Sequence, residues 1–123
     1  MSTITVTNIK ATGNTASYVA SDLAGFRVHH SGDSPTTNES SNMSSLTDNG
    51  AGDYTYAFTN SFNTAYYSSS AMSTEDGTIG YVTMYYDRSY TRSASNLRLQ
   101  GVDQSDSFDD GAFTSVVSHG DLA

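Results

Sequence analysis

The chain of 123 residues carries 13 acidic and 5 basic side chains, a formal net charge of −8, and no cysteine. Nucleic-acid recognition needs clustered lysines and arginines, so the charge balance argues against it. The missing cysteines exclude disulfides, thiolate metal sites and cysteine nucleophiles. The length is that of a single domain.

The composition favours a β protein with many turns. Hydrophobic residues make up 36 % of the chain, with nine tyrosines and no tryptophan, against roughly 45–50 % in ordinary domains. Threonine and tyrosine suit half-buried strands, and asparagine, aspartate and glycine suit turns. Because tyrosine works where one end is apolar and the other is wet, this thin core suggests association between chains.

The N-terminal residues predict an extended arm. Residues 3–10 alternate Ile4 and Val6 with threonines, which indicates a strand, and residues 16–20 form a second extended segment. Few large apolar side chains occur before residue 23, so we expect residues 1–22 to dock on the main domain or a partner chain and residues 23–123 to form the folded domain. The N-terminus lacks the basic and apolar regions of a signal peptide, and no segment reaches the roughly 18 apolar residues of a membrane span, so we expect a soluble protein made in a cytoplasm.

A hairpin at residues 43–58 is the strongest local signal. Tyr54, Tyr56 and Phe58 recur with period two, which predicts one buried aromatic face. Residues 48–52, Asp-Asn-Gly-Ala-Gly, supply the turn, and their number predicts a bulge or a longer loop. Before the hairpin, residues 25–30 predict a strand and the polar residues 31–42 predict an exposed loop.

Further strands are predicted at residues 65–72, 79–86, 96–100 and 112–119, separated by turns at 75–77 and 103–111. Residues 79–86 are apolar on both faces, which places that strand inside a sheet or against another chain. Strands spaced by turns at about ten-residue intervals predict an all-β fold, an antiparallel β-sandwich of jelly-roll type.

Candidate chemistry is sparse. His29 and His30 are neighbours, so on a strand they point to opposite faces and do not share a metal. No nucleophile elbow or converging pair of carboxylates is present, so we predict no enzyme, no catalytic residues, no metal and no cofactor. One acidic group leaves two readings open, a calcium site or a solvated turn, and its members are Asp103, Asp106, Asp109 and Asp110.

Exposed tyrosines and arginines are the candidate recognition residues. Flat amphipathic rings beside short polar groups are typical of surfaces that bind carbohydrate or protein. The alternative is that the rings fill the core and a subunit interface, while the arginines pair with acidic neighbours on a solvated strand. The candidates are Tyr66, Tyr67, Tyr86, Tyr90, Arg88 and Arg92.

The hairpin also carries a family resemblance. Residues 44–55 read SSLTDNGAGDYT and are followed by Phe58, Asn63 and Tyr66. This pattern resembles a segment of tailed-bacteriophage fibre and related virion proteins. The end of the chain, FTSVVSHGDLA, resembles the closing strand of the same domain, and the opening STITVTNIKATG is similar to its N-terminal arm. Phe26-Arg27-Val28-His29 stands where the family has Trp-Val-Asn-Phe.

The resemblance implies a structural protein of the virion, a homotrimeric fibre or appendage whose exposed loops recognise the host surface. It implies partners among further copies of the chain, other virion proteins and a host glycan or protein, and it supplies no catalytic residues. The arm would then dock on the virion or on a neighbouring subunit. A capsid decoration protein that stabilises the head is the alternative, and a bacterial adhesin is a third class that would require secretion.

Overall fold

The computed structural model describes residues 8–9, 18–19, 25–32, 35–74, 81–86 and 93–123, and for 8–9, 18–19 and 81–86 it describes the backbone alone. Within these ranges all the regular structure is β-strand. The strands, in chain order, are β1 (Asn8–Ile9), β2 (Tyr18–Val19), β3 (Gly25–Ser31), β4 (Thr37–Ser41), β5 (Met43–Gly50), β6 (Asp53–Phe58), β7 (Ser68–Thr74), β8 (Tyr81–Tyr86), β9 (Asn96–Val102) and β10 (Phe113–His119).

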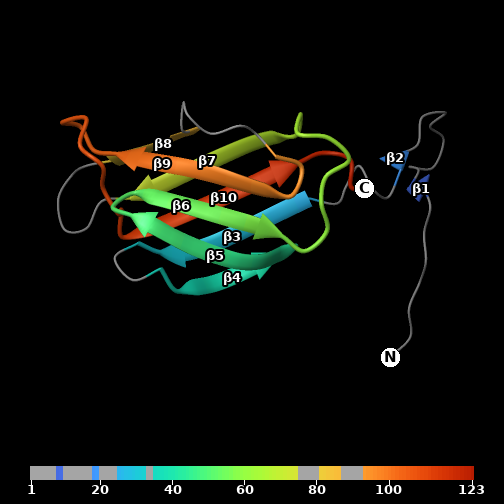
Figure 1. Ribbon diagram of the computed structural model, residues 1–123, viewed down its shortest axis with the longest axis horizontal. Helices are drawn as coiled ribbons and strands as arrows, with labels where there is room; N and C mark the ends of the chain where they lie inside the picture. The colour runs from blue at the N-terminus through green and yellow to red at the C-terminus, as the bar shows by residue number, and fades with distance from the viewer. Residues whose placement is uncertain (1–7, 10–17, 20–24, 33–34, 75–80, 87–92) are drawn as a thin grey trace.

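Eight of these strands form one sheet in the order β4-β3-β10-β7-β8-β9-β6-β5, with antiparallel neighbours throughout. The sheet doubles over into two layers, with β9, β6 and β5 in front of β7, β10 and β3 in Figure 1. Between the layers, the ring of Phe26 on β3 lies 5.0 Å from that of Phe58 and 5.8 Å from that of Tyr56. The predicted antiparallel β-sandwich is therefore confirmed.

The two layers are joined through β7 and β8. Among the described residues, Ser73 pairs with Val82 and Thr74 with Tyr81, and β10 pairs with both β3 and β7 over its whole length. The strand predicted at residues 79–86 is described from Tyr81 on, and it lies between β7 and β9, in agreement with an interior position. Its side chains lie outside the part of the chain that the structure describes.

The aromatic alternation predicted for the hairpin builds the core. Tyr54, Tyr56 and Phe58 are all buried, and Tyr54 and Tyr56 stand opposite Leu99 and Leu97 of β9, which are buried too. Strand pleating puts these alternate side chains on one face, and burial of their large rings dominates the packing energy.

The hairpin turn is shorter than its five turn residues suggested. β5 runs through Gly50 and β6 begins at Asp53, so only Ala51 and Gly52 connect the two strands. The predicted bulge is present as a register shift between Asp48 and Gly50. Asp48 Oδ1 accepts a hydrogen bond from the Gly50 N–H at 2.9 Å, and Gly50 and Gly52 both have positive φ angles. These two features fix the turn.

Two boundary predictions were wrong. Residues 31–42 are not one loop, because β4 pairs with β3 as an edge strand. All five of its residues are exposed, so hydropathy gives no sign of it. The strand predicted at 65–72 begins at Ser68 instead and runs to Thr74, since the ladder with β10 pairs these residues with His119 and Phe113.

The predicted arm is described at four residues. Asn8 pairs with Val19 and Ile9 with Tyr18, which makes β1 and β2 a two-stranded sheet separate from the sandwich. The rest of the predicted strands at 3–10 and 16–20, and the turn at 75–77, lie outside the described residues.

Gly52 gives a test of the turn. A Cβ at this position would lie 2.5 Å from the Gly101 oxygen and 2.7 Å from the Asp109 oxygen, on a backbone with φ of +65°. Gly52→Ala should lower the free energy of unfolding by about 3 kcal/mol or more, because strain and a backbone clash add. Gly50→Ala, at φ +132° with no atom within 4 Å, should cost about 1–2 kcal/mol from strain alone. Urea unfolding measures both, and equal losses would contradict this account.

Candidate functional site

A buried histidine connects the two layers. His30 of β3 is fully buried; its Nδ1 lies 2.8 Å from the Ser31 carbonyl oxygen and its Nε2 lies 2.9 Å from the Tyr56 hydroxyl oxygen. Because a carbonyl oxygen only accepts, Nδ1 carries the hydrogen and Nε2 accepts from the tyrosine. Burial lowers the pKa of His30 and raises the pKa of Tyr56. Both groups are thus neutral structural links rather than a free base and acid.

The inner face of β10 is mostly hydroxylic. Thr114 and Ser118 are fully buried on either side of Val116. Each bonds a serine of β7: Ser73 Oγ lies 2.9 Å from Thr114 Oγ1, and Ser69 Oγ lies 2.7 Å from Ser118 Oγ. These cross-strand pairs satisfy polar groups that would otherwise destabilise the core.

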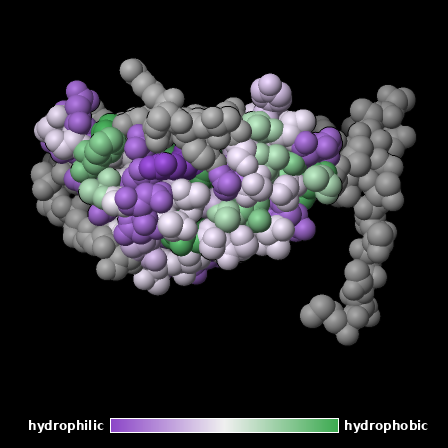
Figure 2. Space-filling model, viewed as in Figure 1, coloured by the Kyte–Doolittle hydropathy of each residue, from purple (hydrophilic) through white to green (hydrophobic). Residues whose placement is uncertain are grey.

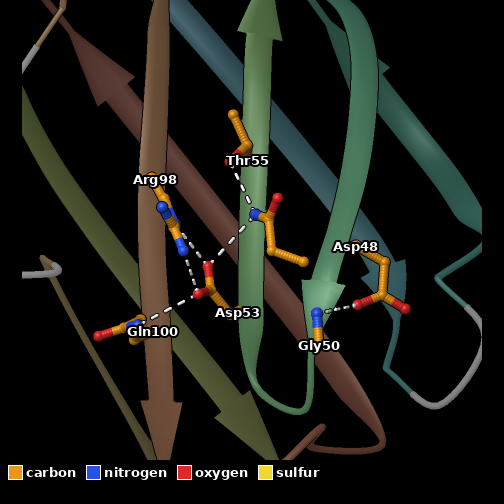
Figure 3. A network of polar contacts seen from close by, with 7 residues as sticks. Asp48, Gly50, Asp53, Thr55, Arg98 and Gln100 are labelled. Carbon is orange, nitrogen blue, oxygen red and sulfur yellow. Dashed lines mark hydrogen bonds and ion pairs between the residues drawn. The ribbon is translucent and has the colours of Figure 1, made fainter. Parts of the chain in front are cut away.

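The outer face of β5, β6 and β9 carries an ion-pair network. Arg98 donates from Nε to Asp53 Oδ1 at 2.8 Å and from Nη2 to Oδ2 at 2.6 Å, and Gln100 and Asn49 donate to the same carboxylate (Figure 3). This forked geometry is the strong form of a charged hydrogen bond. The hydrogen bonds from Arg98 hold the pKa of Asp53 below its usual range.

The same side of the molecule is covered mainly by hydrophilic side chains (Figure 2). Asp53 is engaged by three different side chains, so it is not available as a catalytic base. We assign this face to stabilisation of the β5–β6 hairpin against β9.

The opposite outer face, formed by β4, β3, β10 and β7, has a different character. Register fixes its two central rows, which are Ser70, Val117, Arg27 and Ser41 in one, and Met72, Ser115, His29 and Glu39 in the other. Half of these eight side chains are short, since three are serines and one is Val117. They leave a hollow of about 350 Å³ that is lined among others by Arg27, His29, Ala71, Met72, Ser115 and Val117. An apolar concavity with a few polar groups is the usual form of a binding site.

One contact in this hollow resembles part of a hydrolase site. His29 Nδ1 lies 2.8 Å from Ser115 Oγ, and the imidazole stacks on Phe113 with ring centroids 5.7 Å apart. Acyl transfer also needs N–H donors aimed at a developing oxyanion. Ser115 stands in a strand paired on both sides along its length, so the N–H groups of β10 are committed to the sheet.

The structure separates two of the predicted recognition residues. Tyr67 is buried, stacks on Phe62 with ring centroids 4.4 Å apart, and donates its hydroxyl to the Asn96 oxygen at 2.9 Å. Its neighbour Tyr66 is 89 % exposed. Tyr67 thus serves the core, and Tyr66 keeps the properties of a surface residue.

The structure describes little of the other four candidates. Tyr86 closes β8, where the backbone alone is described, and Tyr90, Arg88 and Arg92 lie outside the described residues. The sequence analysis did not single out the hollow. Its signal is the placement of Phe113 and Val117 two residues to either side of Ser115 on β10, a spacing that puts all three on one face.

The acidic group at residues 103–110 is partly used by the fold itself. Asp110 Oδ1 accepts from the Gly52 N–H and from the Tyr54 hydroxyl, both at 2.6 Å. Asp103 Oδ1 accepts from two backbone N–H groups of its own turn, at 2.7 and 2.9 Å. Within the described ranges no three histidine, cysteine, aspartate or glutamate side chains gather in a way that could hold a metal ion.

No family model, curated protein or solved structure matches this chain. Across the residues that the structure describes, no helix is long and apolar enough to cross a membrane.

The Asp53 network predicts a pH-dependent stability. Asp53→Asn should lower the free energy of unfolding by about 1–3 kcal/mol at neutral pH, because Arg98 loses a charged acceptor. The folded-state pKa of Asp53 is lowered, so its contribution is present above the unfolded-state value of about 4 and is lost as the pH falls through the folded-state value. The difference in the free energy of unfolding between wild type and Asp53→Asn should therefore become smaller as the pH falls into the acid range. Asp106→Asn, at an exposed position, is the control, and a gap that stays constant with pH would contradict the prediction.

His30 predicts a second pH window. Its folded-state pKa is lowered, so protons favour the unfolded chain as the pH falls below about 6.5, and stability that is present above that pH is lost. His30→Gln should cost about 1–3 kcal/mol at neutral pH through the broken contacts, and its stability should depend less on pH between about 7 and 5 than that of wild type. Equilibrium unfolding at each pH tests this, and parallel curves for His30→Gln and wild type would refute it.

Proposed function

We propose that this chain is a structural protein of a tailed-phage virion, one subunit of a homotrimeric fibre or appendage that takes part in attachment to the host surface. Its partners in this proposal are further copies of itself, other virion proteins and a host-surface glycan or protein. The N-terminal arm, residues 1–22, would dock on the virion or on a neighbouring subunit.

The observation that carries the proposal is the hairpin motif of residues 44–55. Four of its residues make specific contacts in the fold. Asp48 accepts a hydrogen bond within the turn, and the backbone of Gly52 passes close to two other backbone segments. Asp53 accepts from Arg98, and the Tyr54 hydroxyl donates to Asp110. A motif whose residues build a scaffold would recur among proteins that share the scaffold. This supports the resemblance to phage virion proteins as a likeness of the domain.

The state of the polar groups supports a structural rather than a catalytic role. The Asp53 carboxylate is bound by Arg98, the Asp110 carboxylate by Gly52 and Tyr54, and His30 is buried and neutral. Catalysis needs acids and bases that can reach a substrate. These two carboxylates and this imidazole are instead engaged within the fold.

Tyr66 is the best-placed recognition residue in this proposal. It lies in the segment between β6 and β7 and is 89 % exposed, and its N–H donates to Thr64 Oγ1 at 3.2 Å. An exposed flat ring beside a short hydroxyl suits stacking on a sugar ring or contact with a protein loop.

A capsid decoration protein is the second candidate. Both roles use a small trimeric β domain, but a decoration protein would sit on the head at symmetry axes and raise its stability, whereas an appendage would reach the cell surface.

Labelling of the intact virion tests the proposal. Antibodies against this chain should mark an appendage and block adsorption, and Tyr66→Ser should reduce adsorption about tenfold, as expected for the loss of one ring contact. Phe108→Ser, at another exposed aromatic residue, should leave adsorption unchanged. Labelling of the head, with a head that loses stability when the chain is deleted, would favour decoration. Particles without any label would contradict both roles.

A further inference from the structure

We propose that the outer face of β3, β10 and β7 is the surface through which copies of this chain assemble, the same face of neighbouring copies packing around a three-fold axis. We call it the assembly face and define it by its outward side chains, which are Arg27, His29, Ser70, Met72, Phe113, Ser115 and Val117. The inference rests on the proposed homotrimer and names the surface that would hold it together.

Exposed apolar side chains gather on this face. In the described part of the chain, five large hydrophobic side chains are exposed, and three of them belong here: Met72 at 78 %, Phe113 at 52 % and Val117 at 38 %. Met72 stands opposite Ser115, the residue midway between the other two on β10. Diagonal neighbours on adjacent strands lie about 7–8 Å apart, so the three form one continuous patch. Continuous apolar patches on a surface mark interaction sites.

Charge identifies the occupant as another copy. None of the chain's 13 acidic residues lies in β3, β7 or β10, although the chain has a net charge of −8. On the adjacent edge strand, Glu39 is neutralised by Arg27 at 2.7 Å. Copies of an acidic chain repel one another, and the repulsion is smallest where no unpaired carboxylates meet. The assembly face is a surface of this kind, and it is also the surface that carries the exposed apolar side chains.

The shape of the face offers a place for a side chain of a neighbouring copy. The short Ser70 and Ser115 lie among the larger Arg27, Met72 and Val117, and all five line the hollow of about 350 Å³. Around a three-fold axis the contact between neighbouring copies is heterologous, so an outward side chain of one copy meets a different part of the same face on the next. The side chain of Met72 is unbranched and adaptable, so it suits the hollow of a neighbouring copy.

The contrast with the other outer face supports this assignment. The side formed by β5, β6 and β9 is mainly hydrophilic (Figure 2), and its Asp53–Arg98 pair is closed within one subunit. Burial of that side would remove charged groups from water without a new partner, which costs free energy. Burial of the assembly face also covers the Arg27–Glu39 pair, but it removes the exposed apolar side chains of Met72, Phe113 and Val117 from water, which favours association.

Sedimentation equilibrium of the full chain tests the proposal with three variants. Wild type should be trimeric at micromolar concentration. Met72→Glu should weaken association at least about 100-fold, because it buries a charge without a partner, and Met72→Ser should weaken it about tenfold through lost apolar area. Tyr66→Glu places the same charge at an equally exposed residue away from the face and should assemble like wild type. Far-UV circular dichroism checks that each variant is folded.

The outcomes separate this inference from the proposed function. A trimeric wild type whose Met72 variants also remain trimeric would overturn the assembly face and leave the virion role standing. A monomeric wild type would overturn self-assembly altogether, and binding of a host polysaccharide or a virion protein lost in Met72→Glu would then assign the face to that partner. Trimers that dissociate in both Met72 variants but not in Tyr66→Glu would support the proposal.

Discussion

The aromatic row on one face of β6 is the constraint on which the rest of the sandwich depends. Tyr54 and Tyr56 lie against the leucines of β9 within their own layer, and Tyr56 and Phe58 contact Phe26 of the opposite layer. The two tyrosines also end in hydroxyls that need partners, and those partners, Asp110 and His30, come from other segments. One strand therefore fixes the hairpin, the layer contact and two hydrogen bonds, one buried and one partly buried, at once.

The sequence predicts this strand well because its signal is local. Alternating large rings next to a run of turn residues have one physical solution, a hairpin with the rings inside. β4 was missed for the opposite reason, since all its residues are exposed and its pairing with β3 depends on a distant neighbour rather than on its own hydropathy. The buried face of β10 was equally hidden, because apolar residues occur on both sides of that strand.

Because apolar residues occur on both sides of β10, the hollow on its outer face was also not predictable from the sequence. On β10 the polar Thr114 and Ser118 point inward, where serines of β7 satisfy them, and Phe113 and Val117 point outward. Hydropathy alone would place the larger apolar residues inside. Only the partner hydroxyls, which come from another strand, make the inward polar residues stable. The apolar outer face follows directly from this arrangement, since strand alternation leaves those side chains no other side.

A core of this kind makes assembly physically reasonable. Hydroxyl pairs and a neutral histidine satisfy their own hydrogen bonds, but they contribute less to the free energy of folding per unit of buried area than leucine would. Much of the driving force for folding must therefore come from burial of the aromatic rings. Three of the remaining large apolar side chains are then outside, on three strands without a single acidic residue in a chain of net charge −8. Repulsion between like-charged copies is smallest where carboxylates are few and paired, as Glu39 is with Arg27 at the edge of this face. The face whose apolar side chains remain exposed in the single subunit is thus the one that copies of the chain can bury.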